Sequence, residues 1–140
     1  MTQKVYQLDE ATAVDVHHKR EWVRGHYEPE ARQKYDSLEG KLNLLDAIVS
    51  NGWIEPTETL KLQSLGVTFG DALVQQCGLE WVVVEDEYGR DPALSLPGTS
   101  VILFPLTTIS KRIEAGDAVN VRELFLNACS TIQRARPATN

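Results

Sequence analysis

The chain has 140 residues, 42% of them hydrophobic and 24% charged, and its formal net charge is −6. This size and composition are typical of one globular domain, so we expect a single domain over residues 1–140 with loosely ordered ends at 1–8 and 137–140. The acidic balance argues against a nucleic-acid-binding protein, which usually carries a basic patch, and it suits a basic protein partner.

The sequence has no apolar run long enough to cross a membrane. No stretch approaches roughly 18 apolar residues, and residues 1–9 lack the apolar core of a secretory signal. We therefore expect a cytoplasmic protein without a membrane partner. Cys77 and Cys129 each lie on an apolar face near the end of a predicted helix. Buried free thiols are the preferred interpretation, because unpaired cysteine is among the most buried residue types, and a disulfide is the alternative.

The first predicted helix begins after Asp9, a capping residue, and runs to about Arg24 before Gly25. Its apolar stripe, at steps of three and four, comprises Leu8, Ala11, Val14, His18 and Trp22. The histidines of this region are His17, His18 and His26. His17 and Glu21 lie one turn apart, as two metal ligands can. Two ligands do not make a site, so we interpret them as part of an exposed helix face and predict no metal.

Two further helices follow. Pro29 begins the second helix, Gly52 ends it, and a short linker joins it to the first, so the two are expected to form a helical hairpin. The third helix begins near Thr57 and ends at Gly78. Its apolar stripe comprises Leu62, Leu65, Phe69, Leu73 and Cys77.

Gly66 and Gly70 lie one turn apart in the third helix. Each weakens the helix by roughly 1 kcal/mol relative to alanine, so their presence needs a reason. The preferred reason is a flat face against which another backbone packs closely. The alternative is space for a ligand or a partner beside Asp71.

The next segment predicts a small antiparallel meander. Residues 79–85 contain a continuous apolar run that suits a central strand with both faces buried, residues 93–96 form a short second strand, and residues 99–104 form a third. Two C-terminal helices follow, one from Thr107 or Thr108 to Glu114 and one capped by Asn120. The fold class is therefore α+β, with an N-terminal helical hairpin and a third helix packed on the meander and two helices after it.

A polar turn separates the first two predicted strands. Its residues are Glu85, Asp86, Glu87, Tyr88, Arg90 and Asp91. Lys111 and Arg112 are candidate partners for an ion-pair network with this acidic loop, because their helix begins just after the third strand. Most such charge runs are solvated faces; binding of a partner is the leading functional interpretation, and acid–base catalysis or a metal site is less favoured.

Three segments of the chain resemble a known family. They are Gly70 to Leu73, Leu79 to Leu94, and Pro97 to Arg112, within residues 65–112. Together they resemble the bacterial family catalogued as a domain of unknown function, number 3806. The resemblance implies a small bacterial α+β domain, and it brings no activity, cofactor or catalytic residue with it.

Two functions are compatible with these observations, and neither uses a cofactor or an assigned catalytic residue. The first is a protein-binding module, in its specific form an immunity- or antitoxin-like protein, that engages a basic partner through the acidic loop. The second is a small enzyme or ligand-binding domain with its site between the Gly66 and Gly70 helix and the loop 85–91. The set Asp71, Gly70, Lys111 and Arg112 marks the predicted pocket.

Overall fold

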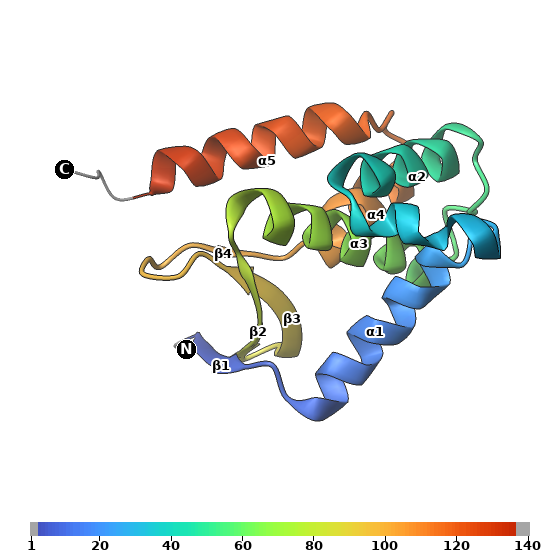
Figure 1. The fold of residues 1–140 in the computed structure, drawn as a ribbon. Helices are drawn as coiled ribbons and strands as arrows, with labels where there is room; N and C mark the ends of the chain where they lie inside the picture. The colour runs from blue at the N-terminus through green and yellow to red at the C-terminus, as the bar shows by residue number, and fades with distance from the viewer. Residues whose placement is uncertain (1–2, 137–140) are drawn as a thin grey trace.

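Six helical segments and a four-stranded antiparallel sheet make up residues 3–136, the part of the chain described by the computed structural model (Figure 1). The α+β class is therefore confirmed. The expectation of a loosely ordered tail concerns residues 137–140, which lie outside the described range. The elements are β1 (Lys4–Gln7), α1 (Glu10–Arg24), the 3₁₀ helix η1 (Pro29–Asp36), α2 (Leu38–Ser50), α3 (Thr59–Cys77), β2 (Glu80–Asp86), β3 (Gly89–Ser95), β4 (Ile102–Leu103), α4 (Leu106–Glu114) and α5 (Val121–Ala135).

Helix α3 lies at the centre of the fold, with α1 and α2 on one side and the sheet on the other (Figure 1). All five residues of its predicted stripe are buried. The two glycines serve close packing, as the preferred interpretation holds. A methyl group added at Gly66 would come within 3.0 Å of the backbone of Pro105 and Leu106, and one added at Gly70 would lie 2.7 Å from the Trp81 ring.

The sheet has the strand order β1-β2-β3-β4, so β2 is an internal strand as predicted. Strand β1 pairs with β2 from Lys4 opposite Glu85 to Gln7 opposite Val82. The expectation of a loosely ordered lead-in over residues 1–8 is therefore wrong for residues 4–7. All four residues of β1 are exposed. No apolar run marks them as a strand, and their order comes from the backbone of β2.

Helix α1 has the predicted caps but buries a different face. The Asp9 side chain accepts a hydrogen bond from the Thr12 amide, and Gly25 follows the last residue. Its buried apolar residues are Val16 and Val23, whereas Val14 of the predicted stripe is exposed. The stripe prediction is wrong because the inward face also carries a charged residue, Arg20, whose partner is on α3.

The predicted second helix is two elements. Residues 29–36 form η1, and α2 begins after Ser37, whose hydroxyl accepts a hydrogen bond from the Gly40 amide. The polypeptide doubles back so tightly that a methyl group at Gly40 would clash with the Lys34 carbonyl. Helices α1 and α2 both pack on α3, and η1, which replaces the start of the predicted second helix, lies between them along the chain.

The third strand is shorter than predicted. Its two residues, 102 and 103, replace the expected 99–104, because the Thr99 hydroxyl bonds to the local backbone at Leu96 and Val101 and extends the preceding turn. Helix α4 ends at Glu114, and the Asn120 side chain caps α5 through the Glu123 amide, as predicted. Among the described helices, none is both long and apolar enough to span a bilayer.

Candidate functional site

The predicted acidic loop is the tip of a β-hairpin. Strands β2 and β3 pair up to Asp86 opposite Gly89, so only Glu87 and Tyr88 form the turn. The Asp86 carboxylate accepts a hydrogen bond from the Tyr88 amide at 2.8 Å, and Gly89 adopts a φ of 128° that other residues rarely reach. The tip is therefore an ordered extension of the sheet, and the predicted second strand begins four residues earlier than expected.

Arg90 is the cation that holds the hairpin tip. Its guanidinium binds Glu85 and Asp9, both at 2.7 Å, and lies over the Tyr6 ring at 5.3 Å. The Thr12 amide and Arg90 lower the pKa of Asp9 from 3.8 to about 2. Among the described ion pairs of this tip, the role expected of Lys111 and Arg112 belongs to Arg90. Arg112 instead donates to a carbonyl of its own helix.

The remaining residues of the tip face solvent. Glu87 and Asp91 are exposed, and the Tyr88 side chain at the turn is 87% exposed. Opposed residues of an antiparallel pair project from the same face, so the Glu85–Arg90 pair and the Val84–Asp91 pair mark opposite faces of the hairpin. Charged side chains therefore lie on both faces of the hairpin near its turn.

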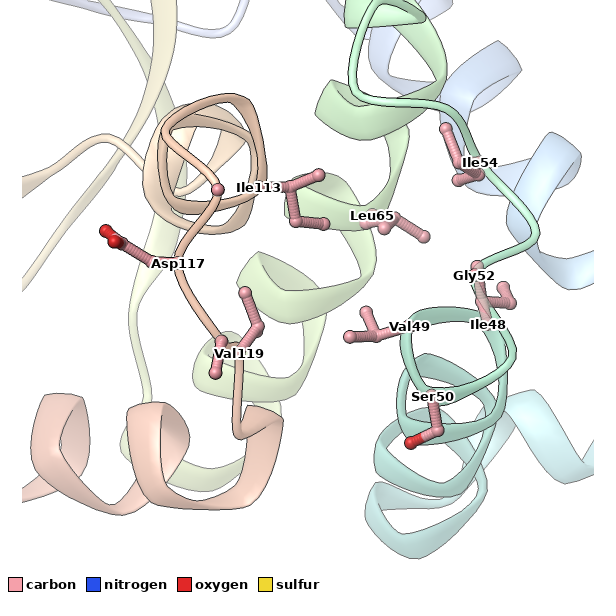
Figure 2. A pocket seen from close by; sticks show the side chains of 11 residues that line it. Ile48, Val49, Ser50, Gly52, Ile54, Leu65, Ile113, Asp117 and Val119 are labelled. Carbon is pink, nitrogen blue, oxygen red and sulfur yellow. The ribbon is translucent and has the colours of Figure 1, made fainter.

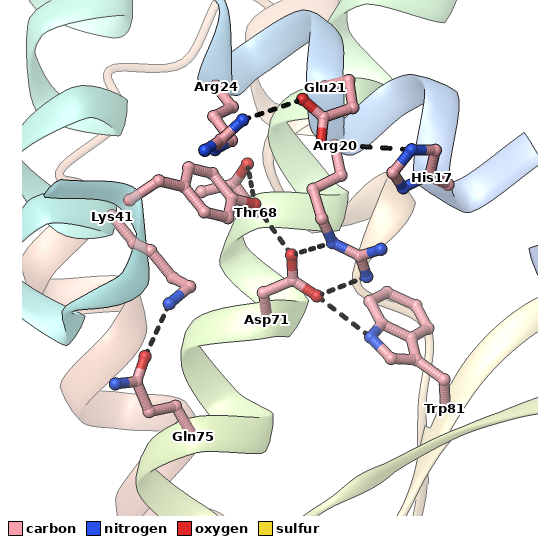
Figure 3. A network of polar contacts seen from close by, with 10 residues as sticks. His17, Arg20, Glu21, Arg24, Lys41, Thr68, Asp71, Gln75 and Trp81 are labelled. Atoms are coloured by element: carbon pink, nitrogen blue, oxygen red, sulfur yellow. Dashed lines mark hydrogen bonds and ion pairs between the residues drawn. The ribbon is translucent and has the colours of Figure 1, made fainter. Parts of the chain in front are cut away.

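Asp71, placed by the sequence in a possible pocket, is the acceptor of a polar network instead (Figure 3). Its carboxylate accepts from Arg20 at 2.6 and 2.8 Å, from the Tyr35 hydroxyl at 2.7 Å and from the Trp81 indole at 3.1 Å. Tyr35 also bonds to Thr68 at 2.9 Å. Through these contacts Asp71 on α3 links α1, η1 and β2, so its primary role is to stabilise the packing of these elements.

Lys41 is the third charged group of this network. Only 7% of the residue is exposed, its ammonium donates to Gln75 at 2.6 Å, and it lies over the Tyr35 ring at 5.1 Å. Burial lowers the pKa of Lys41, and burial together with Asp71 raises the pKa of Tyr35. A shallow cavity of about 660 Å³ opens beside these groups, with Arg20, Arg24 and Trp81 also on its wall.

The predicted pocket residues are not brought together. The Trp81 ring and Pro105 occupy the space beside Gly70, which leaves no room there for a ligand. Asp71 lines the cavity next to Lys41, whereas Lys111 lines a different one. Within the described residues 3–136, the walls of these two cavities include none of Glu85, Asp86 and Tyr88. The arrangement therefore does not join Asp71 and the acidic tip into one acid–base centre.

Lys111 shares a cavity wall with two residues of the hairpin tip, Arg90 and Asp91. A cavity of about 450 Å³ lies between α1, α3, β3 and α4, and its wall includes Lys111, Arg90, Asp91, Lys19 and Asp15. Lys19 forms an ion pair with Asp15 at 2.6 Å. Arg90 is paired with Glu85 and Asp9, so the ammonium of Lys111 and the carboxylate of Asp91 are the charged groups on this wall without a described ion pair.

A separate cleft is aliphatic (Figure 2). It has a volume of about 330 Å³ and lies between the end of α2, the middle of α3 and the link from α4 to α5. Val49, Ile113 and Val119 point into it, and the oxygens of Ser50 and Asp117 point away. The labelled side chains that point into the cleft are aliphatic, so they offer no polar group with which to orient a reaction.

The histidines are dispersed along α1 and the turn after it. His17 lies 4.0 Å from Glu21 on an exposed helix face, which agrees with the preferred interpretation. His26 hydrogen-bonds to the Trp22 carbonyl at 2.9 Å and packs edge-on against the Trp22 ring. Within residues 3–136, no group of three or more side chains is arranged to hold a metal ion.

The polar residues that sequence reasoning missed are those around Asp71. Arg20, Tyr35, Lys41 and Trp81 come from four different segments, and only a charged residue between Val16 and Val23 hinted at the network. That hint is visible once the stripe of α1 is drawn through Val16 instead of Val14.

Comparison with known proteins gives a family and a fold. A crystal structure from Bacteroides thetaiotaomicron VPI-5482 superposes with a TM-score of 0.76 at 17% sequence identity, over 94% of this chain and 48% of that one. The chain thus spans about half the length of that protein, and the likeness concerns the fold. No curated protein matches the chain. The profile of the family described as a domain of unknown function (DUF3806) matches residues 41–125, which include the segments that suggested it, and the chain belongs to this family.

Proposed function

We propose that the chain is a protein-binding module that engages a basic partner through the tip of the β2–β3 hairpin, residues 85–91. The charge of the tip is the observation that carries this proposal. Four carboxylates, those of Glu85, Asp86, Glu87 and Asp91, surround a single guanidinium, that of Arg90. Arg90 is already bound to Glu85 and Asp9, so it does not neutralise Glu87 or Asp91.

The order of the tip supports the same role. Its backbone is held by the β2–β3 ladder and by the hydrogen bond from Tyr88 to Asp86, so little conformational entropy is lost when a partner binds. The exposed Tyr88 ring lies at the centre of the charges. An aromatic side chain surrounded by polar groups is the usual composition of an interaction hot spot.

The specific form of the proposal is an immunity- or antitoxin-like protein that covers the basic active site of a toxin enzyme inside the cell. Enzymes that cut nucleic acids have basic clefts, and an acidic protein surface can occupy such a cleft in place of the substrate. The small size and the net charge of −6 support this form. A toxin gene beside this one would favour it over other binding roles.

Charge removal at the tip tests the proposal. The double variant Glu87→Gln, Asp91→Asn removes two exposed charges that have no described ion pair, and Glu28→Gln, Glu30→Gln makes the same change in net charge at exposed positions in η1 and before it. Both variants are used as bait in lysate of the native host at low and high salt. The bound protein is identified by mass spectrometry, purified and titrated against each variant.

The proposal expects a basic bound protein whose affinity falls with added salt. Removing two rim charges should weaken that affinity about tenfold, because each exposed pair contributes at most about 1 kcal/mol. The control variant should bind like the parent. Failure to capture a partner at low salt, or equal affinities for the two double variants, would contradict the role of the tip.

A second candidate function is supported by the cavity beside Lys111. Its volume of about 450 Å³ is that of a small-molecule site, and its wall includes both a cationic residue, Lys111, and an acidic one, Asp91. A small zwitterion such as a free amino acid would complement both charges. Thermal-shift screening with the free amino acids tests this candidate, with Lys111→Met as the matched variant. A ligand that stabilises both proteins equally does not use this cavity.

A further inference from the structure

Two cysteine thiols that are 52 residues apart in the sequence meet where α3 ends. Cys77 is the last residue of α3, and Cys129 lies in α5. Their sulfur atoms are 3.4 Å apart, and the Cys77 thiol donates a hydrogen bond to the Cys129 sulfur. Both are free cysteines. A disulfide bond requires the sulfurs to approach from 3.4 Å to about 2.0 Å.

Small molecules can reach this pair. The two cysteines line the same open cavity of about 290 Å³, together with Gln76, Gln133 and Arg136. Cys77 is 8% exposed and Cys129 is more accessible. The Arg136 guanidinium donates to the Cys77 carbonyl, so a positive charge stands at the entrance. That charge favours an anionic oxidant over a neutral one.

We propose that Cys77 and Cys129 are a redox modification site at which a low-molecular-weight disulfide of the glutathione class forms an intramolecular disulfide between α3 and α5. In the first step the Cys129 thiolate attacks one sulfur of oxidised glutathione, and one glutathione thiolate leaves. In the second step Cys77 gives up its proton, its sulfur attacks the Cys129 sulfur, and the second glutathione leaves. Two electrons and two protons thus pass from the protein thiols to two molecules of glutathione.

The bond would fasten α5 to the junction between α3 and β2. Gly78 directly follows Cys77, and β2 begins two residues later. Closing a loop of 52 residues restricts the unfolded chain, which raises the Tm of the oxidised protein by about 10 °C. Burial raises the pKa of the Cys129 thiol to about 12, so its thiolate is scarce and the exchange is slow.

The test is to incubate the reduced protein with oxidised glutathione overnight and to measure intact mass, free thiols and Tm. The parent should lose both thiols, become lighter by two hydrogen atoms, stay monomeric in its covalent state and melt about 10 °C higher. Peptide mapping should find the fragments that contain Cys77 and Cys129 linked. Reduction should restore the original mass and Tm.

The single variants Cys77→Ser and Cys129→Ser serve as controls. Each retains one thiol, so each should gain at most one glutathione and show no rise in Tm. Persistence of both thiols in the parent, mixed disulfides without the internal bond, or an oxidised parent that melts no higher than the reduced one would overturn the proposal. The parent alone supplies these readouts, so a variant that fails to fold does not remove the test.

Discussion

Replacing Asp71 by asparagine should unfold the protein at markedly lower denaturant concentration or temperature. The carboxylate accepts from Arg20 twice, from Tyr35 and from Trp81. An amide of the same shape has one accepting oxygen, so the donors at the other position face an NH₂ group. One oxygen of Asp71 serves Arg20 and Tyr35 and the other serves Arg20 and Trp81. With the NH₂ group in one orientation, Arg20 and Trp81 each lose an acceptor. In the other orientation Arg20 loses one, because the Tyr35 hydroxyl can donate to Thr68 and accept from the amide.

The loss of unfolding free energy in Asp71→Asn can be estimated from the burial of the two charged groups. Removing one partner of a fully buried ion pair costs about 3–5 kcal/mol, because the other charge is left without compensation. The side chain of Asp71 is 11% exposed, but that of Arg20 is 28% exposed, so water recovers part of the loss for Arg20. We expect Asp71→Asn to lower the free energy of unfolding by about 2–3 kcal/mol. For a chain of this size that corresponds to a fall in Tm of about 6–10 °C.

Urea unfolding followed by tryptophan fluorescence measures this change, with Trp81 as a reporter inside the network. The matched control is Asp36→Asn, the same chemical change at an exposed position on the wall of the same cavity. That variant should stay within about 0.5 kcal/mol of the parent. In a double-mutant cycle, Arg20→Gln and Asp71→Asn should be strongly non-additive. If Asp71→Asn and Asp36→Asn unfold alike, the network contributes nothing and the reasoning fails.

Three further changes probe other parts of the fold. Gly66→Ala should destabilise by about 2 kcal/mol in urea titration, since the clash with the Leu106 backbone outweighs a helix gain of about 1 kcal/mol; a stabilised variant would contradict the packing. Lys41→Met should raise the free energy of unfolding by about 1 kcal/mol at neutral pH, because the buried ammonium is removed. Burial lowers the pKa of Lys41, so the difference in stability between variant and parent should shrink as pH rises towards 10.5. A difference that stays constant with pH would exclude the charge as its cause. Asp9→Asn should lower the Tm above pH 4. Since the folded pKa of Asp9 is about 2, the difference in Tm should diminish below pH 4 and disappear as pH falls through about 2; a pH-independent difference would refute this.

The elements found from the sequence are those with local signals. The end of α3 at Gly78 was predictable because the residue adopts a left-handed conformation, with φ of 70°, that glycine alone adopts without strain. The caps of α1 and α5 were predictable because Asp9 and Asn120 bond to amides three residues away. The internal position of β2 followed from apolar residues on both of its faces. In each case the determining contact lies within a few residues of the signal.

The elements that sequence reasoning missed depend on distant partners. Strand β1 is ordered by β2, about 80 residues later, and its own residues are exposed. The buried face of α1 was misplaced because Arg20 is half-buried by its bond to Asp71, 51 residues away, and a charged residue is ordinarily assigned to the surface. The counter-charge of the acidic tip was assigned to Lys111 and Arg112, but the hairpin register places Arg90 directly opposite Glu85.

The Asp71 network and the acidic hairpin tip lie at opposite ends of β2, so variants can change one without the other. Binding can therefore be tested apart from stability. Trp81 at the start of β2 belongs to the Asp71 network, whereas the acidic tip lies at the other end of the same strand. Strands β2 and β3 pair along seven residue positions, from Glu80 opposite Ser95 to Asp86 opposite Gly89, and the turn has its own hydrogen bond from Tyr88 to Asp86. The geometry of the tip is therefore fixed locally. Asp71→Asn should lower the free energy of unfolding and leave the affinity for a basic partner unchanged below the Tm. The tip variant should show the reverse, and a loss of affinity in Asp71→Asn would place the binding surface beside α1 instead.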